Sequence, residues 1–372
     1  MKNKPVRAKR TFGLDLMRAT AIIMVLCSHI LWIYPQSSGY ISQLFQLFGF
    51  LGVEVFFVLS GFLIGRILYK LYTKENFTIS SVFYFLKRRW YRTLPNYYLI
   101  LLINIFIAYV VIGYEIQELW KYFFFVQNAF HTMLPFFPES WSLSIEEFTY
   151  LAVPFMLLAG SLIFKNIKNR KNLFFIIFLT GFIFFIANKM HYAFTTNNTT
   201  LSQWNLSLKA VVMYRIDAIL TGILASWLYC NYYDFWRKYR YVFALFGSLF
   251  FLGMYLGVGY FRITIEHFPI FWNVFYLPLT SLTFALFLPV LSELETPPKY
   301  IGKSVYFVSI TSYSVYLLHY SVVLQLMKYF FDTNQFTTNQ LHVFTGFYLF
   351  ITFFLSYLLY RFYEKPIMDL RE

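Results

Sequence analysis

Charged residues are scarce in this sequence. Asp, Glu, Lys and Arg make up 13% of its 372 residues, whereas about 25% is usual for a soluble domain. A water-soluble protein of this length could not cover its surface with so few charges, which excludes the soluble classes. Hydrophobic residues make up 59% of the chain and aromatic residues 24%. The apolar runs recur along the whole chain and predict a polytopic membrane protein.

Cysteine is also nearly absent. The two cysteines, Cys27 and Cys230, lie within or at the end of apolar segments, so neither a disulfide framework nor a cysteine-rich metal site is expected. No metal is predicted. The formal net charge is +14, but no zinc finger, RNP or comparable motif accompanies it, so nucleic acid is not an expected partner.

The length of the apolar segments predicts an all-α fold. Strands of a membrane β-barrel would be shorter and would alternate apolar with polar residues. A spanning helix needs about 20 apolar residues. An amphipathic stretch at residues 120–130 predicts a further helix along the outer face. About ten transmembrane helices are predicted, at residues 14–34, 48–69, 93–113, 140–164, 172–190, 205–230, 242–261, 269–291, 305–328 and 339–361.

Lys and Arg predict the orientation of these helices. They cluster in alternate loops and are few in the others. Because basic residues mark cytoplasmic loops, the N- and C-termini are both expected in the cytoplasm. We therefore predict a basic cytoplasmic N-terminus at residues 1–13, a membrane domain at 14–363 and a cytoplasmic C-terminal tail at 364–372. No soluble domain is expected before or after the spans.

The first span carries ionisable residues, which are costly in a bilayer and are therefore functional candidates. Arg18 and His29 lie eleven residues apart, close to three helical turns, so they share one face with Asp15. A histidine satisfied by a neighbouring helix is the alternative interpretation of His29. The polar face favours a functional one.

The second span contains Glu54 in the run GFLGVEVFFVLSGFLIG. A carboxylate buried in a bilayer needs a partner or a proton, so we interpret Glu54 as functional. Gly61 and Gly65 form a GxxxG pair on nearly the same face, which we interpret as a site of close helix packing.

The fourth span opens with SWSLSIEEFTYLAVP. Ser142, Glu146 and Tyr150 follow one another at one-turn spacing and are predicted to lie along one functional face. Ser144 and Glu147 have the spacing of a capping box, so a structural role and a catalytic role both stay open for this pair.

Two later spans add further candidates. Arg215 and Asp217 in YRIDAILTG point to different sides of their helix, so each is expected to have a partner on another helix. His319 in SYSVYLLHY has the same two interpretations as His29.

Depth in the bilayer relates these residues to one another. Counted at about 1.5 Å per residue from the span ends, four of them fall in the outer half, and Arg215 and Asp217 lie nearer the centre. This predicts a buried polar chamber that is reached from the outer face. The four outer residues are His29, Glu54, Glu146 and His319.

A basic run, FLKRRWYRTLP, precedes the third predicted span. It places Arg88, Arg89 and Arg92 within one or two turns, a fork suited to a multiply phosphorylated ligand. The alternative is a topology anchor whose side chains reach lipid phosphates.

The series of motifs resembles the acyltransferase 3 family of integral membrane acyltransferases. The motifs occur in the family's order across nearly the whole chain. They are Arg18 followed by His29, GFLGVEVFFVLSGFLI, RRWYRTLP, WSLSIEEFTY, RIDAILTG, SYSVYLLH and FYEKP.

The resemblance implies a ten-helix enzyme of the bacterial cytoplasmic (inner) membrane. It would transfer an acyl group, most often acetyl, from cytoplasmic acyl-CoA to a hydroxyl of an extracytoplasmic glycan, although some relatives modify small molecules. The family's membrane histidine corresponds to His29 and its paired arginine to Arg18. Its RRxxR element corresponds to Arg88, Arg89 and Arg92.

Three departures from the family pattern are visible. Glu54 stands where Asp is usual, and Phe148 replaces the usual Gln after the paired glutamates. Many relatives also carry a fused SGNH hydrolase-like domain that is not recognised here. Any second transfer step is therefore expected to need a separate partner.

These residues suggest a mechanism. The arginine cluster would hold the phosphates of acyl-CoA, with Arg18 along the path of the pantetheine arm. His29 would be the general base, oriented by Glu54 or Glu146, and an acyl-histidine intermediate stays open. The residues expected to bind the acceptor substrate are Ser142, Arg215, Asp217 and His319.

The expected partners are acyl-CoA, a hydroxyl-bearing acceptor such as a glycan, and membrane lipid. The alternative function is that of a transporter or flippase for a lipid-linked sugar, which would also need charges inside the membrane. Many transporters are built from two related halves with paired broken helices. The motifs of this chain are not duplicated between halves.

Overall fold

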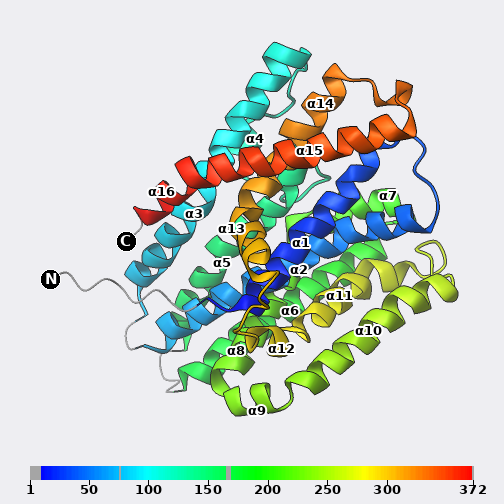
Figure 1. Cartoon of the computed structure of the whole chain (residues 1–372). Helices are drawn as coiled ribbons and strands as arrows, with labels where there is room; N and C mark the ends of the chain where they lie inside the picture. The colour runs from blue at the N-terminus through cyan, green and yellow to red at the C-terminus, as the bar shows by residue number, and fades with distance from the viewer. Residues whose placement is uncertain (1–9, 75–76, 165–168, 371–372) are drawn as a thin grey trace.

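Long apolar helices dominate the structure, a computed structural model that describes residues 10–74, 77–164 and 169–370 (Figure 1). Within these ranges there is no β-strand. Nine of the helices in the described ranges are long and apolar enough to cross a bilayer, and the shorter apolar helix α8 corresponds to the remaining predicted span, the sixth, at residues 205–230. The prediction of an all-α polytopic membrane protein is confirmed.

The helices fall into two length classes. The longer ones are α1 (Phe12–Ile30), α2 (Tyr40–Thr73), α3 (Ile79–Phe106), α5 (Trp141–Ile163), α6 (Arg170–Thr195), α10 (Arg240–Tyr260), α13 (Gly302–Leu318) and α15 (Thr338–Leu359). The shorter ones are α4 (Trp120–Phe123), α7 (Leu201–Trp204), α8 (Ile216–Asn231), α9 (Tyr233–Lys238), α11 (Tyr276–Ala285), α12 (Leu288–Ser292), α14 (Gln325–Phe330) and α16 (Lys365–Asp369). Several are prolonged by π-helical turns, at Ile107–Ile112, Phe271–Phe275, His319–Leu324 and Tyr360–Glu364.

The third span is longer than its predicted bounds of 93–113. It begins with α3 at Ile79 and continues through a π-helical turn to Ile112. At its start, the backbone N–H of Thr78 donates to the side chain of Ser81, a contact that stabilises a helix N-terminus. The three arginines of the RRWYR run therefore lie inside the helix, not in front of it.

Two other predicted helices are interrupted. Residues 120–130, predicted as an amphipathic helix, form only the single turn of α4. The left-handed conformation of Phe125, with φ of 60°, is incompatible with a continuing right-handed helix. The predicted sixth span is irregular over residues 205–214, and regular helix begins at Ile216.

Glycines allow α2 and α8 to approach each other closely. A Cβ atom on Gly61 would collide with the carbonyl oxygen of Ile219, and one on Gly222 would collide with that of Val58. Such close approach increases van der Waals contact, which is the main attraction between helices in lipid. The predicted packing role of the GxxxG pair is confirmed.

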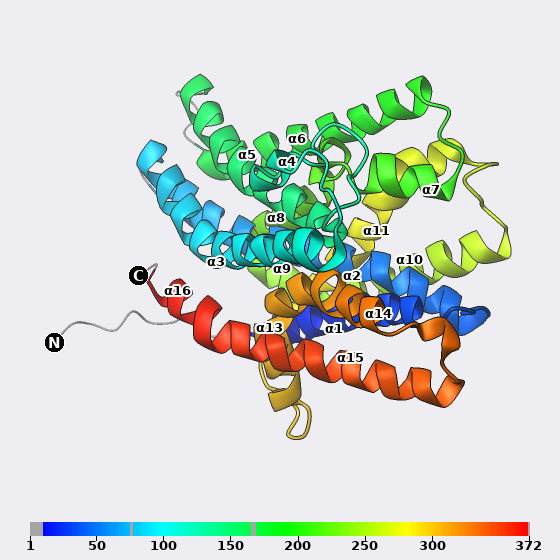
Figure 2. The same ribbon diagram turned by 90° about the horizontal axis from the view of Figure 1, so that it is seen from above.

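The two ends of the bundle differ in charge. We call the end that carries Arg66, Lys70, Arg88 and Arg170 the basic end. Helix α16 lies at this end and α7 at the opposite end (Figure 2). Figure 1 shows α15 and α10 on opposite sides of the bundle, with α1 and α2 between them. Helix α1 starts near the basic end and ends with His29 toward the opposite end.

Candidate active site

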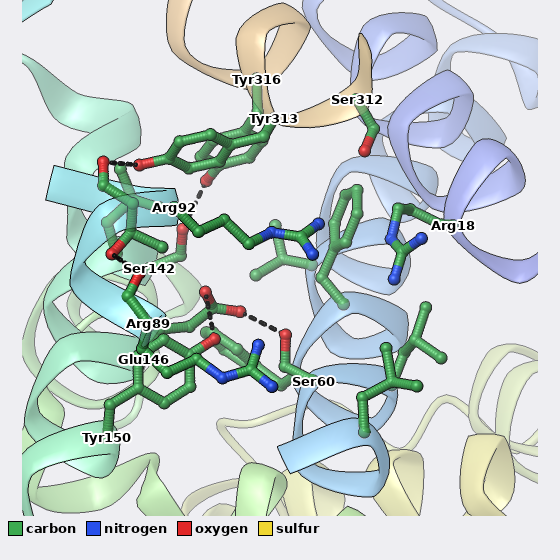
Figure 3. Close-up of a pocket in the computed structure, with 17 residues that line it drawn as sticks. Arg18, Ser60, Arg89, Arg92, Ser142, Glu146, Tyr150, Ser312, Tyr313 and Tyr316 are labelled. Atoms are coloured by element: carbon green, nitrogen blue, oxygen red, sulfur yellow. Dashed lines mark hydrogen bonds between the residues drawn. The ribbon is translucent and has the colours of Figure 1, made fainter. Parts of the chain in front are cut away.

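A cavity of about 90 Å³ lies between α1, α2, α3, α5 and α13 (Figure 3). It combines apolar and aromatic side chains with a group of polar ones. The polar lining consists of Arg18, Ser60, Arg89, Arg92, Thr93, Ser142, Glu146 and Ser312, with the hydroxyl-bearing rings of Tyr150, Tyr313 and Tyr316.

Three guanidinium groups face this cavity. Arg18 comes from α1, and Arg89 and Arg92 come from α3 on the other side (Figure 3). Arg18 is held by Asp15, whose carboxylate lies 3.3 Å from a guanidinium nitrogen. Among the described residues that line the cavity, the carboxylate is that of Glu146. The excess of positive charge suits an anionic ligand.

Arg88 is separated from the other two arginines of the predicted cluster. Its guanidinium donates to the Tyr84 hydroxyl at 2.8 Å, and it does not line the cavity. Consecutive residues of a helix point about 100° apart. A cavity that faces Arg89 and Arg92 therefore leaves Arg88 on the flank of α3, and the cluster predicted as one unit is divided.

One face of α5 supplies the opposite part of the wall. Glu146 accepts hydrogen bonds from Ser60 at 2.8 Å and from Tyr150 at 3.0 Å. One turn earlier, Ser142 hydrogen-bonds to the Tyr316 hydroxyl at 2.6 Å. Ser142, Glu146 and Tyr150 all line the cavity, so the predicted shared face is confirmed.

The Ser144 and Glu147 pair does not form a capping box. Helix α5 begins at Trp141, three residues before Ser144. Ser144 is therefore inside the helix, where its hydroxyl donates back to the carbonyl oxygen of Ser140.

Tyr316 connects the cavity to a pair of histidines. Its side chain lines the cavity, and its ring centroid lies 5.7 Å from that of His319. The Nε2 atom of His319 lies 3.2 Å from Nδ1 of His29. The two candidate histidines, which come from helices far apart in the sequence, are thus in direct contact.

Hydrogen bonds to the backbone determine the tautomers of this pair. Nδ1 of His319 lies 2.7 Å from the carbonyl oxygen of Tyr316, and Nδ1 of His29 lies 2.9 Å from that of Val25. A carbonyl oxygen only accepts, so both Nδ1 atoms carry the proton. In the neutral rings, Nε2 of His319 can then accept from the Nδ1–H of His29, which the carbonyl oxygen of Val25 shares as a second acceptor. Nε2 of His29 keeps a lone pair and has no hydrogen-bond partner among the described residues.

An irregular turn places His319 at this position. The π-helical turn His319–Leu324 continues α13, and the buried carboxylate of Glu139 accepts from both the backbone N–H (3.0 Å) and the hydroxyl (2.6 Å) of Ser321. The backbone carbonyl of Glu139 also accepts from the Tyr316 hydroxyl at 3.0 Å. Glu139 therefore stabilises the turn on both sides of His319.

Four charged residues form buried ion pairs away from the cavity. Arg215 pairs with Glu54, which also accepts from Ser281 at 2.9 Å. Lys189 and Asp217 pair at 2.7 Å. The expectation that Arg215 and Asp217 have partners on other helices is confirmed. Arg215 and Asp217, two of the four residues predicted to bind the acceptor, do not line the cavity and lie in the helix core.

The predicted contact between a carboxylate and His29 is not made by the described residues. Glu54 pairs with Arg215. Glu146 faces the cavity, where it accepts a hydrogen bond from Ser60. The single polar chamber predicted from depth is therefore divided into three parts. Depth fixes height in the membrane but not the direction in which a side chain points.

No three His, Cys, Asp or Glu side chains in the described ranges gather closely enough to hold a metal ion.

Sequence reasoning missed several residues of these sites. Tyr316 and Ser60 lie inside the motifs SYSVYLLH and VLSGF, but their side chains were not singled out. Lys189, in the predicted span 172–190, was not singled out either. The signal for Lys189 was an isolated lysine at the end of a span, on the side that is otherwise poor in basic residues.

Comparisons with known proteins agree with this picture. The family model described as "Acyltransferase domain" matches residues 11–361. A protein of Staphylococcus aureus (strain COL), provisionally named an O-acetyltransferase, is 26% identical over 377 residues, which cover 95% of this chain and 56% of that protein. Peptidoglycan O-acetyltransferase OatA of Listeria monocytogenes serovar 1/2a is 29% identical over 186 residues, 46% of this chain and 27% of that protein.

The match covers nearly the whole of this chain but only about half of the length of the Staphylococcus aureus relative. No solved structure matches it. The family model covers the cavity, the histidine pair and nearly all of the spans. The chain therefore belongs to the acyltransferase family that this domain defines.

Proposed function

We propose that this protein is a membrane O-acyltransferase that moves an acyl group, with acetyl expected, from cytoplasmic acyl-CoA to a hydroxyl of an extracytoplasmic glycan. Family membership and the names of the O-acetyltransferase relatives support the reaction class. The observation that carries the proposal is the position of Tyr316. This residue belongs both to the wall of the arginine-lined cavity and to the surroundings of His319 and His29.

The cavity is the proposed donor site. Arg18, Arg89 and Arg92 would neutralise phosphates of acyl-CoA by charge-assisted hydrogen bonds. The narrow volume suits the pantetheine chain and the adjoining pyrophosphate rather than the adenosine, so the adenosine would lie toward the basic end and the thioester would point toward Tyr316. The positive-inside rule supports a cytoplasmic location for the basic end.

His29 is the proposed general base. Its Nε2 lone pair would accept the proton of the acceptor hydroxyl as the hydroxyl oxygen attacks the thioester carbonyl carbon. The new C–O bond forms, the C–S bond breaks, and the proton held by His29 passes to the CoA thiolate. His319 would hold the protonated Nδ1 of His29, which keeps Nε2 facing the substrates.

Turnover of labelled acetyl-CoA by the purified protein tests this function. Wild-type protein in detergent or nanodiscs should release CoA and acylate a hydroxyl acceptor, whereas a transporter would do neither. His29→Ala should still bind acetyl-CoA but lose about 100- to 10,000-fold in transfer rate, the usual contribution of a general base. His29→Gln, which can hydrogen-bond but not titrate, should be equally inactive. Near-normal turnover in both variants at matched protein levels would remove His29 from the mechanism.

A further inference from the structure

Lys209 is a cation that has no counter-charge among the described residues. It is partly buried at the end of the π-helical turn Asn205–Lys209. Its Nζ lies 5.5 Å from the ring centroid of Trp141, a cation–π contact that orients the side chain. It makes no hydrogen bond and no ion pair with any of the described residues.

Three carboxylates at the same end of the molecule have other partners. Withdrawing a cation from water is costly unless an opposite charge compensates it. The two buried cations of the helix core, Arg215 and Lys189, are each paired with a carboxylate. Lys209 has no such partner among the described residues. Glu118 forms an ion pair with Lys121. Glu139 accepts a hydrogen bond from Ser321, and Asp332 accepts one from Asn334.

Lys209 also lies toward the same end of the molecule as the proposed base. Its cation–π partner Trp141 directly precedes Ser142, which lines the cavity and hydrogen-bonds to Tyr316. His29 lies in the last turn of α1, on the side away from the basic end. The segment that carries Lys209 follows α7, which lies at the end of the bundle opposite α16 (Figure 2). The arginine proposed to hold donor phosphate on α1, Arg18, lies on the basic-end side of His29, so an anion beside Lys209 belongs to the other substrate.

We propose that Lys209 is an anion subsite for the acceptor, so that the acceptor is a glycan with a carboxylate or phosphate group near the hydroxyl that becomes acylated. This inference rests on the proposed function, because it assigns a property to the acceptor of that reaction. A lysine ammonium is a compact charge with three rotatable donors, which can bind either anion. Anchored in this way, the sugar would present a neighbouring hydroxyl to Nε2 of His29.

Binding of two matched oligosaccharides tests the inference. Oligogalacturonate carries a carboxylate on each sugar, and the same oligomer with methyl-esterified carboxyls is neutral. Titration calorimetry with the full chain in nanodiscs of zwitterionic lipid should show that the anionic oligomer binds about tenfold or more tightly, as expected for a charge-assisted contact. Lys209→Met should abolish this difference and Lys209→Arg should retain it. Equal binding of the two oligomers, no binding of either, or an unchanged preference in Lys209→Met would overturn the inference.

Lys121 provides a matched control. It also lies near a tryptophan ring, 6.0 Å from that of Trp120, but its Nζ is paired with Glu118 at 2.6 Å. Lys121→Met should therefore leave the charge preference unchanged. If it abolishes the preference as Lys209→Met does, the effect is a general surface charge and the subsite assignment is wrong.

Two further measurements separate the remaining explanations. If phosphatidylglycerol in the nanodiscs removes the preference, Lys209 binds a lipid headgroup and the sugar assignment fails. Acetyl-CoA turnover is measured in the same preparations. Failure of the proposed function would appear as no CoA release that depends on His29. Failure of the subsite would appear as intact turnover without any charge preference.

Discussion

Nε2 of His319 lies 3.2 Å from Nδ1 of His29, and each ring is anchored to a backbone carbonyl through its own Nδ1. This chain of contacts starts at the carbonyl of Tyr316 and ends at the lone pair on Nε2 of His29. In a Ser-His-Asp arrangement a carboxylate holds the Nδ1 proton of the base. Here a neutral imidazole occupies that position, so the pair carries no buried charge before a proton is taken up.

His319 is therefore expected to act as a positioning residue. His319→Leu cannot accept from Nδ1 of His29 and should lower kcat by up to about 100-fold, as misplacement of a catalytic group does. The KM for acetyl-CoA should stay near the wild-type value, because His319 does not line the cavity. His319→Gln offers an amide oxygen as acceptor and should recover part of kcat.

The pH dependence of kcat separates positioning from packing. His319→Leu removes the partner of the base and should displace the rate profile along the pH axis, whereas a defect in packing alone would lower the profile without displacing it. If His319→Gln is as slow as His319→Leu and neither profile moves, His319 has only a structural role.

The divided arginine cluster predicts unequal effects on donor binding. Arg89→Gln and Arg92→Gln should each weaken binding of acetyl-CoA by about 10- to 100-fold, because a charge-assisted hydrogen bond contributes about 1.5–3 kcal/mol. Arg88→Gln is the matched control from the same turn of α3. It should change the Kd by less than about fivefold, the limit for a surface contact. Titration calorimetry with CoA would measure all three. Equal losses in all three variants would contradict the division of the cluster.

The shared face of α5 was predicted well, whereas the particular partners that meet across helices were not. Ser142, Glu146 and Tyr150 could be placed on one face because their spacing depends only on helix geometry. Which side of the helix faces which neighbour depends on the packing of the whole bundle. The sequence therefore could not show that Glu54 pairs with Arg215, or that Glu146 faces the arginines rather than His29.

Local irregularities limited the prediction in a second way. Hydropathy identifies apolar length, but the π-helical turn at His319–Leu324 has the composition of ordinary helix. The same holds for residues 205–214, which were counted as the start of a regular span. Both irregular segments carry residues of the proposed sites, His319 and Lys209. The start of α3 was misjudged because the basic run at residues 87–92 interrupts the apolar sequence and separates the first turns of the helix from the apolar window.

The orientation in the membrane is tested by labelling single cysteines from each side. After replacement of the two native cysteines, Thr196→Cys and Gln335→Cys should react with a membrane-impermeant maleimide added to intact cells. Lys299→Cys should react only after the inner face is exposed. All three positions are exposed on the surface of the molecule, so access does not depend on unfolding. Labelling of position 299 from outside, or of 196 and 335 from inside only, would reverse the proposed orientation.

The buried pair of Lys189 and Asp217 gives a test of stability that is independent of donor binding. Both side chains are fully buried and lie 2.7 Å apart. Lys189→Met or Asp217→Leu alone leaves the other charge without a partner, which should destabilise the protein by about 3–5 kcal/mol. The double variant removes both charges and should recover most of that loss, since a buried ion pair can often be replaced by apolar side chains at little net cost. Thermal unfolding in one detergent, followed by fluorescence, would measure the three variants.

Activity of the double variant then decides the role of Asp217, which the sequence predicted to bind the acceptor. Asp217 does not line the cavity, and its partner Lys189 belongs to α6, so we assign the pair to the packing of α6 against α8. A double variant with recovered stability should therefore transfer acyl groups at close to the wild-type rate. If it is as stable as the wild type but has lost transfer, with CoA binding intact, the carboxylate of Asp217 acts on the acceptor and the assignment to packing is wrong.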